Sequence, residues 1–115
     1  MKLTVIDRLM VPKILLETGS VVDGIVRRDV LKKTELTQAE ATRIGLRPTP
    51  DGGLVWDAEK AKAVDVEFTE AELMLLKRGA DEHDRNKSVH WQAVDLVKKI
   101  WDACEPSKQK KSGKE

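Results

Sequence analysis

The chain has 115 residues, 40% of them hydrophobic, and a net charge of +1. This length and apolar content are enough for one modest domain that folds without disulfides or a metal ion. Its single cysteine, Cys104, excludes an intramolecular disulfide. Charged residues interrupt every apolar stretch near the N-terminus. We therefore predict neither a secretory signal peptide nor a membrane-spanning segment of about 20 apolar residues.

The charge is distributed unevenly along the chain. Residues 106–115 contain four lysines and one glutamate, which leaves 17 basic and 19 acidic residues in 1–105. We predict one folded domain, residues 1–105, with a charge of −2. A Lys-rich tail, residues 106–115, has no apolar residue to bury, so we predict that it is disordered. A dedicated DNA-binding domain would instead carry a positive excess in its body.

The first two predicted helices begin where a hydroxyl residue stands three positions before an acid, a spacing that satisfies free backbone N–H groups. The first begins at Thr4, bends or restarts near Val11 because of Pro12, and ends by Gly19. The second covers Val21–Lys33. Its apolar positions follow the helical period, so we expect them to be buried; they are Val22, Ile25, Val26 and Val30.

A short helix from Thr37 to Ile44 and a hairpin from Arg47 to Trp56 are predicted next. The clearest strand is Val64–Phe68, in which apolar and acidic residues alternate. We expect this strand to pair antiparallel with Leu54–Trp56. Trp56 would then lie in the core, and Trp56→Ala would cost about 3–5 kcal/mol.

Two further helices complete the prediction. Thr69 and Glu72 begin a helix that ends near residues 84–86, and the last helix runs from about Ser88 to Ala103 with Cys104 at its buried end. The sequence therefore predicts an α+β fold. About five helices would pack with a small antiparallel sheet of two or three strands.

No pattern in the chain predicts catalysis, a metal ion or a cofactor. Residues 81–84 with His90 form the one cluster that suggests metal binding, but the side chains point in different directions and the spacing matches no familiar zinc site. Cys104 has no histidine near it in the sequence. Residues 51–53 are a turn that lacks the other residues of a phosphate-binding loop. We therefore expect a non-enzymatic protein.

Two tryptophans suggest a protein-binding surface. Trp91 and Trp101 fall beside the apolar stripe of the last predicted helix, and partly exposed tryptophan is a common anchor in interfaces. Covering the edge of the core is the alternative role. A partly exposed apolar helix face is equally suited to a homodimer.

Nucleic-acid binding is the alternative function. The predicted order of helix, helix, short helix and hairpin is that of a winged-helix protein, in which the helix Thr37–Ile44 would enter the major groove. That helix would have almost no net charge with which to attract the DNA phosphates. The cations available are Arg27, Arg28, Lys32 and Lys33 in the second helix and Lys108, Lys110 and Lys111 in the tail.

The order of segments resembles a set of small, largely uncharacterised proteins encoded by bacteriophages and prophages. The matching features are Met1–Val5 leading to Arg8-Leu9, Ile14–Leu16 before Gly19, the cap at Leu36–Glu40, Trp56-Asp57 after a glycine turn, and the strand Val64–Phe68 before a capped helix. The resemblance covers about residues 1–100. It implies phage origin and a location in the cytoplasm of a bacterial host. With the two tryptophans, our interpretation is a small phage accessory protein that binds a host or phage protein. The resemblance implies no catalytic or binding residue.

Overall fold

The structure is a computed structural model and describes residues 1–104. It has the predicted mixture of helices and small antiparallel sheets. In chain order the elements are β1 (Lys2–Leu3), α1 (Val5–Ile14), α2 (Val21–Thr34), α3 (Gln38–Arg43), β2 (Arg47–Pro48), β3 (Leu54–Val55), β4 (Val64–Asp65), α4 (Glu70–Arg85), η1 (Trp91–Ala93, a 3-10 turn) and α5 (Val94–Ala103).

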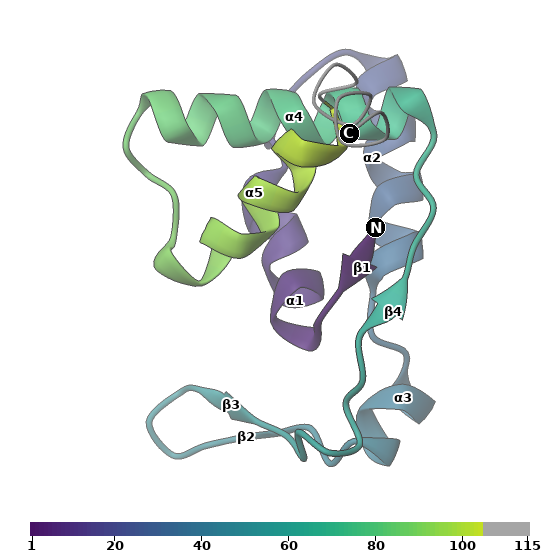
Figure 1. The fold of residues 1–115 in the computed structure, drawn as a ribbon, viewed down its shortest axis with the longest axis vertical. Helices are drawn as coiled ribbons and strands as arrows, with labels where there is room; N and C mark the ends of the chain where they lie inside the picture. The colour runs from purple at the N-terminus through teal and green to yellow at the C-terminus, as the bar shows by residue number, and fades with distance from the viewer. Residues whose placement is uncertain (105–115) are drawn as a thin grey trace, which may run out of the picture.

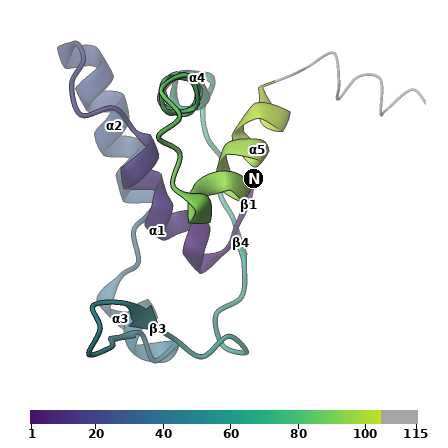
Figure 2. The same ribbon diagram turned by 90° about the vertical axis from the view of Figure 1, so that its left-hand side faces the viewer.

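Within residues 1–104, four helices build the body: α1, α2, α4 and α5 (Figures 1 and 2). Their shared core is apolar and almost fully buried, and its most enclosed members include Leu3, Val11, Ile14, Val30, Leu76, Ala80, Leu96 and Ile100. The short helix α3 and the hairpin β2–β3 lie apart from this body. We call residues 37–62 the arm; it is seen at the bottom of Figure 1. The prediction that about five helices pack around one core is therefore corrected to four, because α3 is six residues long and buries none of them.

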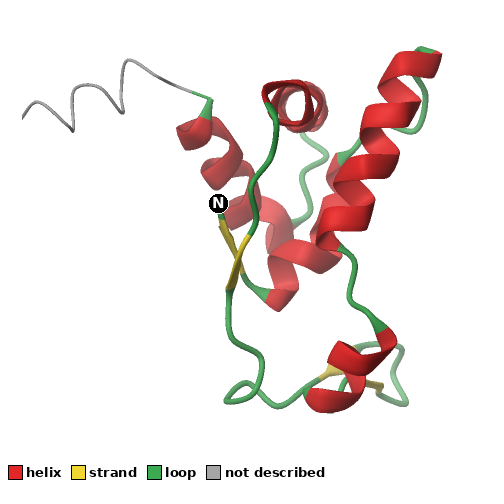
Figure 3. Cartoon of the chain, turned by 90° about the vertical axis from the view of Figure 1, so that its right-hand side faces the viewer, coloured by secondary structure: helices red, strands yellow, loops and turns green. Residues whose placement is uncertain are grey.

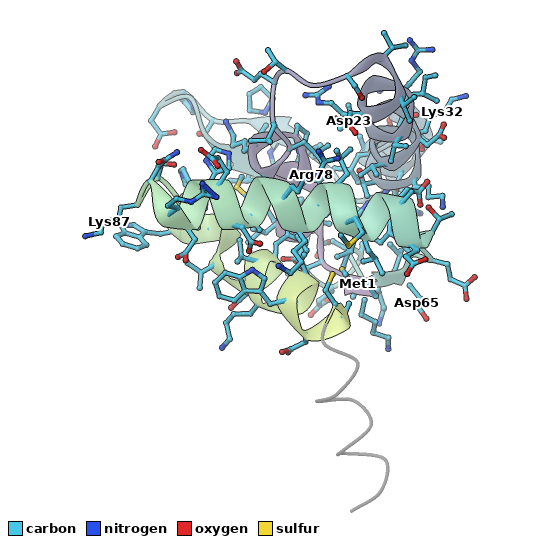
Figure 4. The ribbon with its side chains drawn as sticks, turned by 90° about the horizontal axis from the view of Figure 1, so that it is seen from above. Met1, Asp23, Lys32, Asp65, Arg78 and Lys87 are labelled. Carbon is cyan, nitrogen blue, oxygen red and sulfur yellow. The ribbon has the colours of Figure 1, made fainter. Side chains whose placement is uncertain are left out.

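The predicted helix caps are confirmed. The hydroxyls of Thr4, Ser20, Thr37 and Thr69 each accept a hydrogen bond from the backbone N–H three residues later. The acid at that third position also binds a basic residue on another helix (Asp23 and Arg78 in Figure 4). Each cap thereby fixes both a helix start and a contact between helices. The four pairs are Asp7 with Lys99, Asp23 with Arg78, Glu40 with Arg8, and Glu72 with Lys33.

These paired carboxylates predict that the protein loses stability in acid. The hydrogen bond from Arg78 lowers the pKa of Asp23 from 3.8 to about 2, and the hydrogen bond from Arg8 lowers the pKa of Glu40 below 4.5. Burial raises the pKa of Glu72, but hydrogen bonds from Lys33 and Thr69 outweigh it, and the net pKa is lowered. A group whose pKa is lower in the folded state stabilises above its unfolded pKa, and this contribution is lost as pH falls through the folded pKa.

We therefore expect the free energy of unfolding to be constant from about pH 7 to 5 and to fall steadily below about pH 4.5. Urea unfolding at several pH values measures it. Glu72→Gln is the matched variant; its profile between pH 5 and 3 should be shallower because one titrating group is gone. An unfolding free energy of the wild type that is unchanged down to pH 3 would contradict the prediction.

Two predicted backbone features are wrong. The first helix ends at Ile14, two residues after Pro12, and not near Gly19, because Leu15 is already extended. The strand at Val64 pairs with β1, with Leu3 opposite Val64, and not with Leu54–Trp56 (Figure 3). Residues 54–55 pair instead with β2, in the predicted hairpin. Two separate two-stranded sheets result, one against the body and one in the arm.

Three predicted core residues are not in the core. Trp56 is half-buried, and it lies outside the core cluster because β3 belongs to the arm. The large cost expected for Trp56→Ala is withdrawn for that reason. Val22 and Ile25 are 67% and 52% exposed, because only the opposite side of α2 meets α1 and α4.

The predicted last helix is divided in two. Residues 88–90 are not helical, η1 forms a single 3-10 turn, and α5 begins only at Val94. The predicted buried stripe is confirmed at Ala93, Leu96, Val97 and Ile100.

No helix of residues 1–104 is long and apolar enough to cross a membrane. The predicted tail lies outside the described residues.

Candidate partner-binding surface

Trp91 is the most exposed large apolar side chain in residues 1–104, at 87% of its full accessible surface. It stands on η1, directly after the connection from α4. Beside it lies an open groove of about 310 Å³ lined by Asp84, Lys87, Val89 and Trp91. We call these four residues with Val94, which is 37% exposed, the Trp91 surface.

The backbone on both sides of Trp91 is held by short hydrogen bonds. Lys87, labelled in Figure 4, lies just past the end of α4 and has a φ of 55°, a left-handed conformation. The Ser88 N–H then donates to the His83 carbonyl at 2.8 Å. His90 caps η1, since its Nδ1 accepts from the Gln92 N–H at 3.1 Å. Trp91 is therefore presented on a fixed turn, although nothing in the fold requires its ring.

Ala93 fixes this turn to the body. Its side chain is fully buried, and its N–H donates to the His90 carbonyl at 2.8 Å. Because η1 also packs on α1, the turn cannot fold its exposed ring inward without exposing the alanine. The exposed ring is thus a consequence of how α5 is anchored.

Trp101, the other predicted binding residue, lies in a different setting. It is half-buried against the core, and its indole N–H donates to Asp81 Oδ1 at 2.9 Å. Asp81 also accepts from Lys77 at 2.7 Å, which is the main reason that its pKa is lowered. Trp101 therefore joins α4 to α5, and the Trp91 surface is built without it.

The predicted basic group is divided between two sides of α2. Arg27 is half-buried and donates to the Leu16 carbonyl at 3.2 Å. Lys33 binds Glu72 at 2.7 Å and the Glu67 carbonyl at 2.9 Å. Arg28 and Lys32 are exposed on the opposite side of the helix. The four cations consequently form no continuous surface, and the tail lysines 108, 110 and 111 lie outside the described residues.

Neither Cys104 nor the acidic cluster at residues 81–84 forms a nucleophilic or metal-binding centre within residues 1–104. Cys104 is half-buried, and burial raises the pKa of its thiol, which disfavours the nucleophilic thiolate. In the cluster at 81–84, Glu82 binds Arg85 at 2.9 Å and His83 contacts Ser88 at 3.0 Å. No group of three or more potential metal ligands is found among residues 1–104.

Sequence reasoning missed an apolar patch on the outer side of α2. Val21, Val22 and Ile25 are 81%, 67% and 52% exposed. A signal for it was present, because Val21 and Val22 are adjacent after the Ser20 cap. At 100° per residue, Val21 lies 180° from Val30 around the helix axis and Val22 lies 80° from it. The two valines therefore cannot both face the core that Val30 faces.

The resemblance to phage-encoded proteins stays a prediction. Comparison with protein-family models, with curated proteins and with solved structures gives no match.

Proposed function

We propose that this is a non-enzymatic interaction protein that binds a protein partner through the Trp91 surface. The observation that carries the proposal is a tryptophan left 87% exposed on a hydrogen-bonded turn. A tryptophan ring can bury roughly 200 Å² and contribute several kcal/mol when it leaves water. Folding buries almost none of the surface of Trp91, so this apolar area is available to a partner.

The surface has the composition of an interface centre. An aromatic anchor shares a groove with the aliphatic Val89 and the charged Asp84 and Lys87, and the exposed Val94 follows three residues later in the chain. Anchors of this kind carry most of the binding energy, while rim charges adjust specificity. Because the turn is already fixed by His90 and Ala93, little conformational entropy would be lost on binding.

The test compares Trp91→Ala with wild type in a pull-down from bacterial lysate. Because the ring is exposed, the substitution should change the free energy of unfolding by less than about 0.5 kcal/mol. It should weaken binding of the captured partner by about 30-fold or more, as expected for an interface anchor. The affinity for that partner is then measured with purified proteins.

Leu54→Ala is the control, because Leu54 is an exposed apolar residue (46%) in the arm. It should bind the partner as the wild type does. A folded Trp91→Ala protein that keeps every partner would refute the proposal. So would a wild-type protein that captures none.

A further inference from the structure

The outer side of α2 carries aliphatic residues where a surface helix normally carries polar ones. We define the α2 outer face as Val21, Val22, Ile25, Arg28, Asp29 and Lys32, all of them exposed. Val21, Val22 and Ile25 lie in the first two turns, and the charged residues lie in the last two. The helix forms one edge of the molecule in Figures 2 and 3, and Lys32 is labelled in Figure 4.

This face cannot turn inward. At 100° per residue, Val21 and Ile25 lie on the side of α2 opposite Val30 and Thr34, which are 0% and 1% exposed. Arg27 and Lys33 further fix the rotation of the helix through their bonds to the Leu16 and Glu67 carbonyls. The apolar patch is therefore a fixed feature of the folded chain, and such patches mark sites of association.

We infer that two copies of this chain pair through their α2 outer faces, with the helices antiparallel about a twofold axis near Val22 and Ile25. In that arrangement the three aliphatic side chains of one copy cover those of the other. An antiparallel pair also opposes the two helix dipoles favourably. The face is self-complementary, as a twofold dimer requires.

The charges along α2 favour this antiparallel arrangement. Glu17 lies beside the N-terminal end of α2, on the flank where it lines a cavity with Gly24 and Arg27. Arg28 lies between that flank and the outer face, nearer the C-terminal end of α2. In an antiparallel pair related by a twofold axis perpendicular to the helices, the flank of α2 that carries Glu17 and Arg28 in one copy lies beside the same flank in the other copy. Arg28 of one copy therefore approaches Glu17 of the other, while Asp29 lies on the opposite flank, beside Val22.

The size of the face sets the strength of the dimer. With the twofold axis near Val22 and Ile25, only about the first six residues of the 14-residue α2 lie opposite the same helix of the second copy. A helix pair about 9 Å long buries much less than the roughly 800 Å² per partner of a standard interface. We therefore expect a dissociation constant on the order of 10–100 µM. This inference is independent of the Trp91 surface, and Trp91→Ala should dimerise as the wild type does.

Sedimentation equilibrium of the full chain from about 5 to about 500 µM tests the dimer across its expected dissociation constant. The mass should rise from the monomer value of 12.9 kDa toward twice that value. Ile25→Glu should stay monomeric throughout. Met74→Glu is the matched control, since Met74 is also 52% exposed but lies on α4; it should dimerise normally.

A charge exchange tests the antiparallel pairing. Glu17→Arg alone and Arg28→Glu alone should each weaken the dimer about fivefold, and the double variant should restore it. A wild type that is monomeric at every concentration, or that forms species larger than a dimer, overturns the proposal. Dimerisation of Ile25→Glu, loss of the dimer in Met74→Glu, or single charge reversals without effect overturn it as well.

Discussion

Replacing Gly79 with alanine is expected to lower the free energy of unfolding by about 3 kcal/mol, because overpacking against backbone cannot be relieved by a side-chain rotation. Gly79 is buried in α4 where that helix crosses the end of α1. A Cβ atom there would lie 2.2 Å from the Ile14 carbonyl oxygen and 3.4 Å from the Leu15 Cα. The two helices would have to separate. Their separation would loosen the core on both sides of the contact.

Gly24→Ala is the matched control, since Gly24 is also a helical glycine. A Cβ atom at Gly24 would meet nothing within 4 Å. Alanine there should stabilise the protein by up to about 1 kcal/mol through helix propensity alone. Urea unfolding of both variants measures the contrast. If Gly79→Ala is as stable as Gly24→Ala, the close contact between α1 and α4 is wrong.

Replacing Arg8 with methionine is expected to cost about 3 kcal/mol, the typical result of removing one partner from a buried ion pair. Arg8 is 8% exposed and its guanidinium makes four hydrogen bonds. Two go to the Glu40 carboxylate, at 2.6 and 2.8 Å. The others go to the carbonyls of Thr34 and Glu35, at 3.0 and 2.7 Å. The change would leave a carboxylate and the carbonyls at the end of α2 without their donor.

Two further variants separate charge from geometry at this position. Arg8→Lys keeps the charge, but one ammonium group cannot reproduce the planar fork that serves both carbonyls and the carboxylate. It should recover less than half of the loss. Glu40→Gln keeps one acceptor and should cost about 1 kcal/mol. Full recovery by lysine would show that the guanidinium geometry is unimportant.

Hydrogen exchange locates the effect of Arg8→Met. The arm is joined to the body by Arg8 and by the chain at its two ends, so its amides should exchange faster in the variant. The Leu46 N–H, which donates to the Ala41 carbonyl at 2.9 Å, is a suitable probe. Amides of α4 should still exchange only as fast as the global unfolding of the variant allows. Equal acceleration in both regions would mean that Arg8 acts on the whole fold rather than on the arm.

The local features of the fold could be read from the sequence. Thr4, Ser20, Thr37 and Thr69 determine where helices begin, because a hydroxyl and the backbone three residues later satisfy each other without help from the rest of the chain. Gly45, with a φ of 69°, ends α3 as predicted. The buried positions Leu96, Val97 and Ile100 of α5 were also predicted correctly, since their spacing alone follows the helical period.

The candidate site was only partly predictable. Trp91 and Trp101 have the same residue type and similar positions beside one stripe, yet Trp91 is 87% exposed and Trp101 is half-buried. The difference arises because residues 88–90 are not helical, which rotates Trp91 out of register with α5, and because Asp81 on α4 provides a partner for the Trp101 indole. Neither cause is visible in the spacing of the residues.

The sequence by itself determined the starts of the four capped helices, the arm hairpin and the existence of an apolar core, because each depends on neighbours within a few positions. Only the tertiary structure decided that β4 pairs with β1, that each capping acid binds a particular distant base, and which side of α2 faces water. The strand pairing and the acid–base pairs join residues 32 to 92 positions apart. Such contacts are selected by how whole helices pack, and a local pattern carries no information about them.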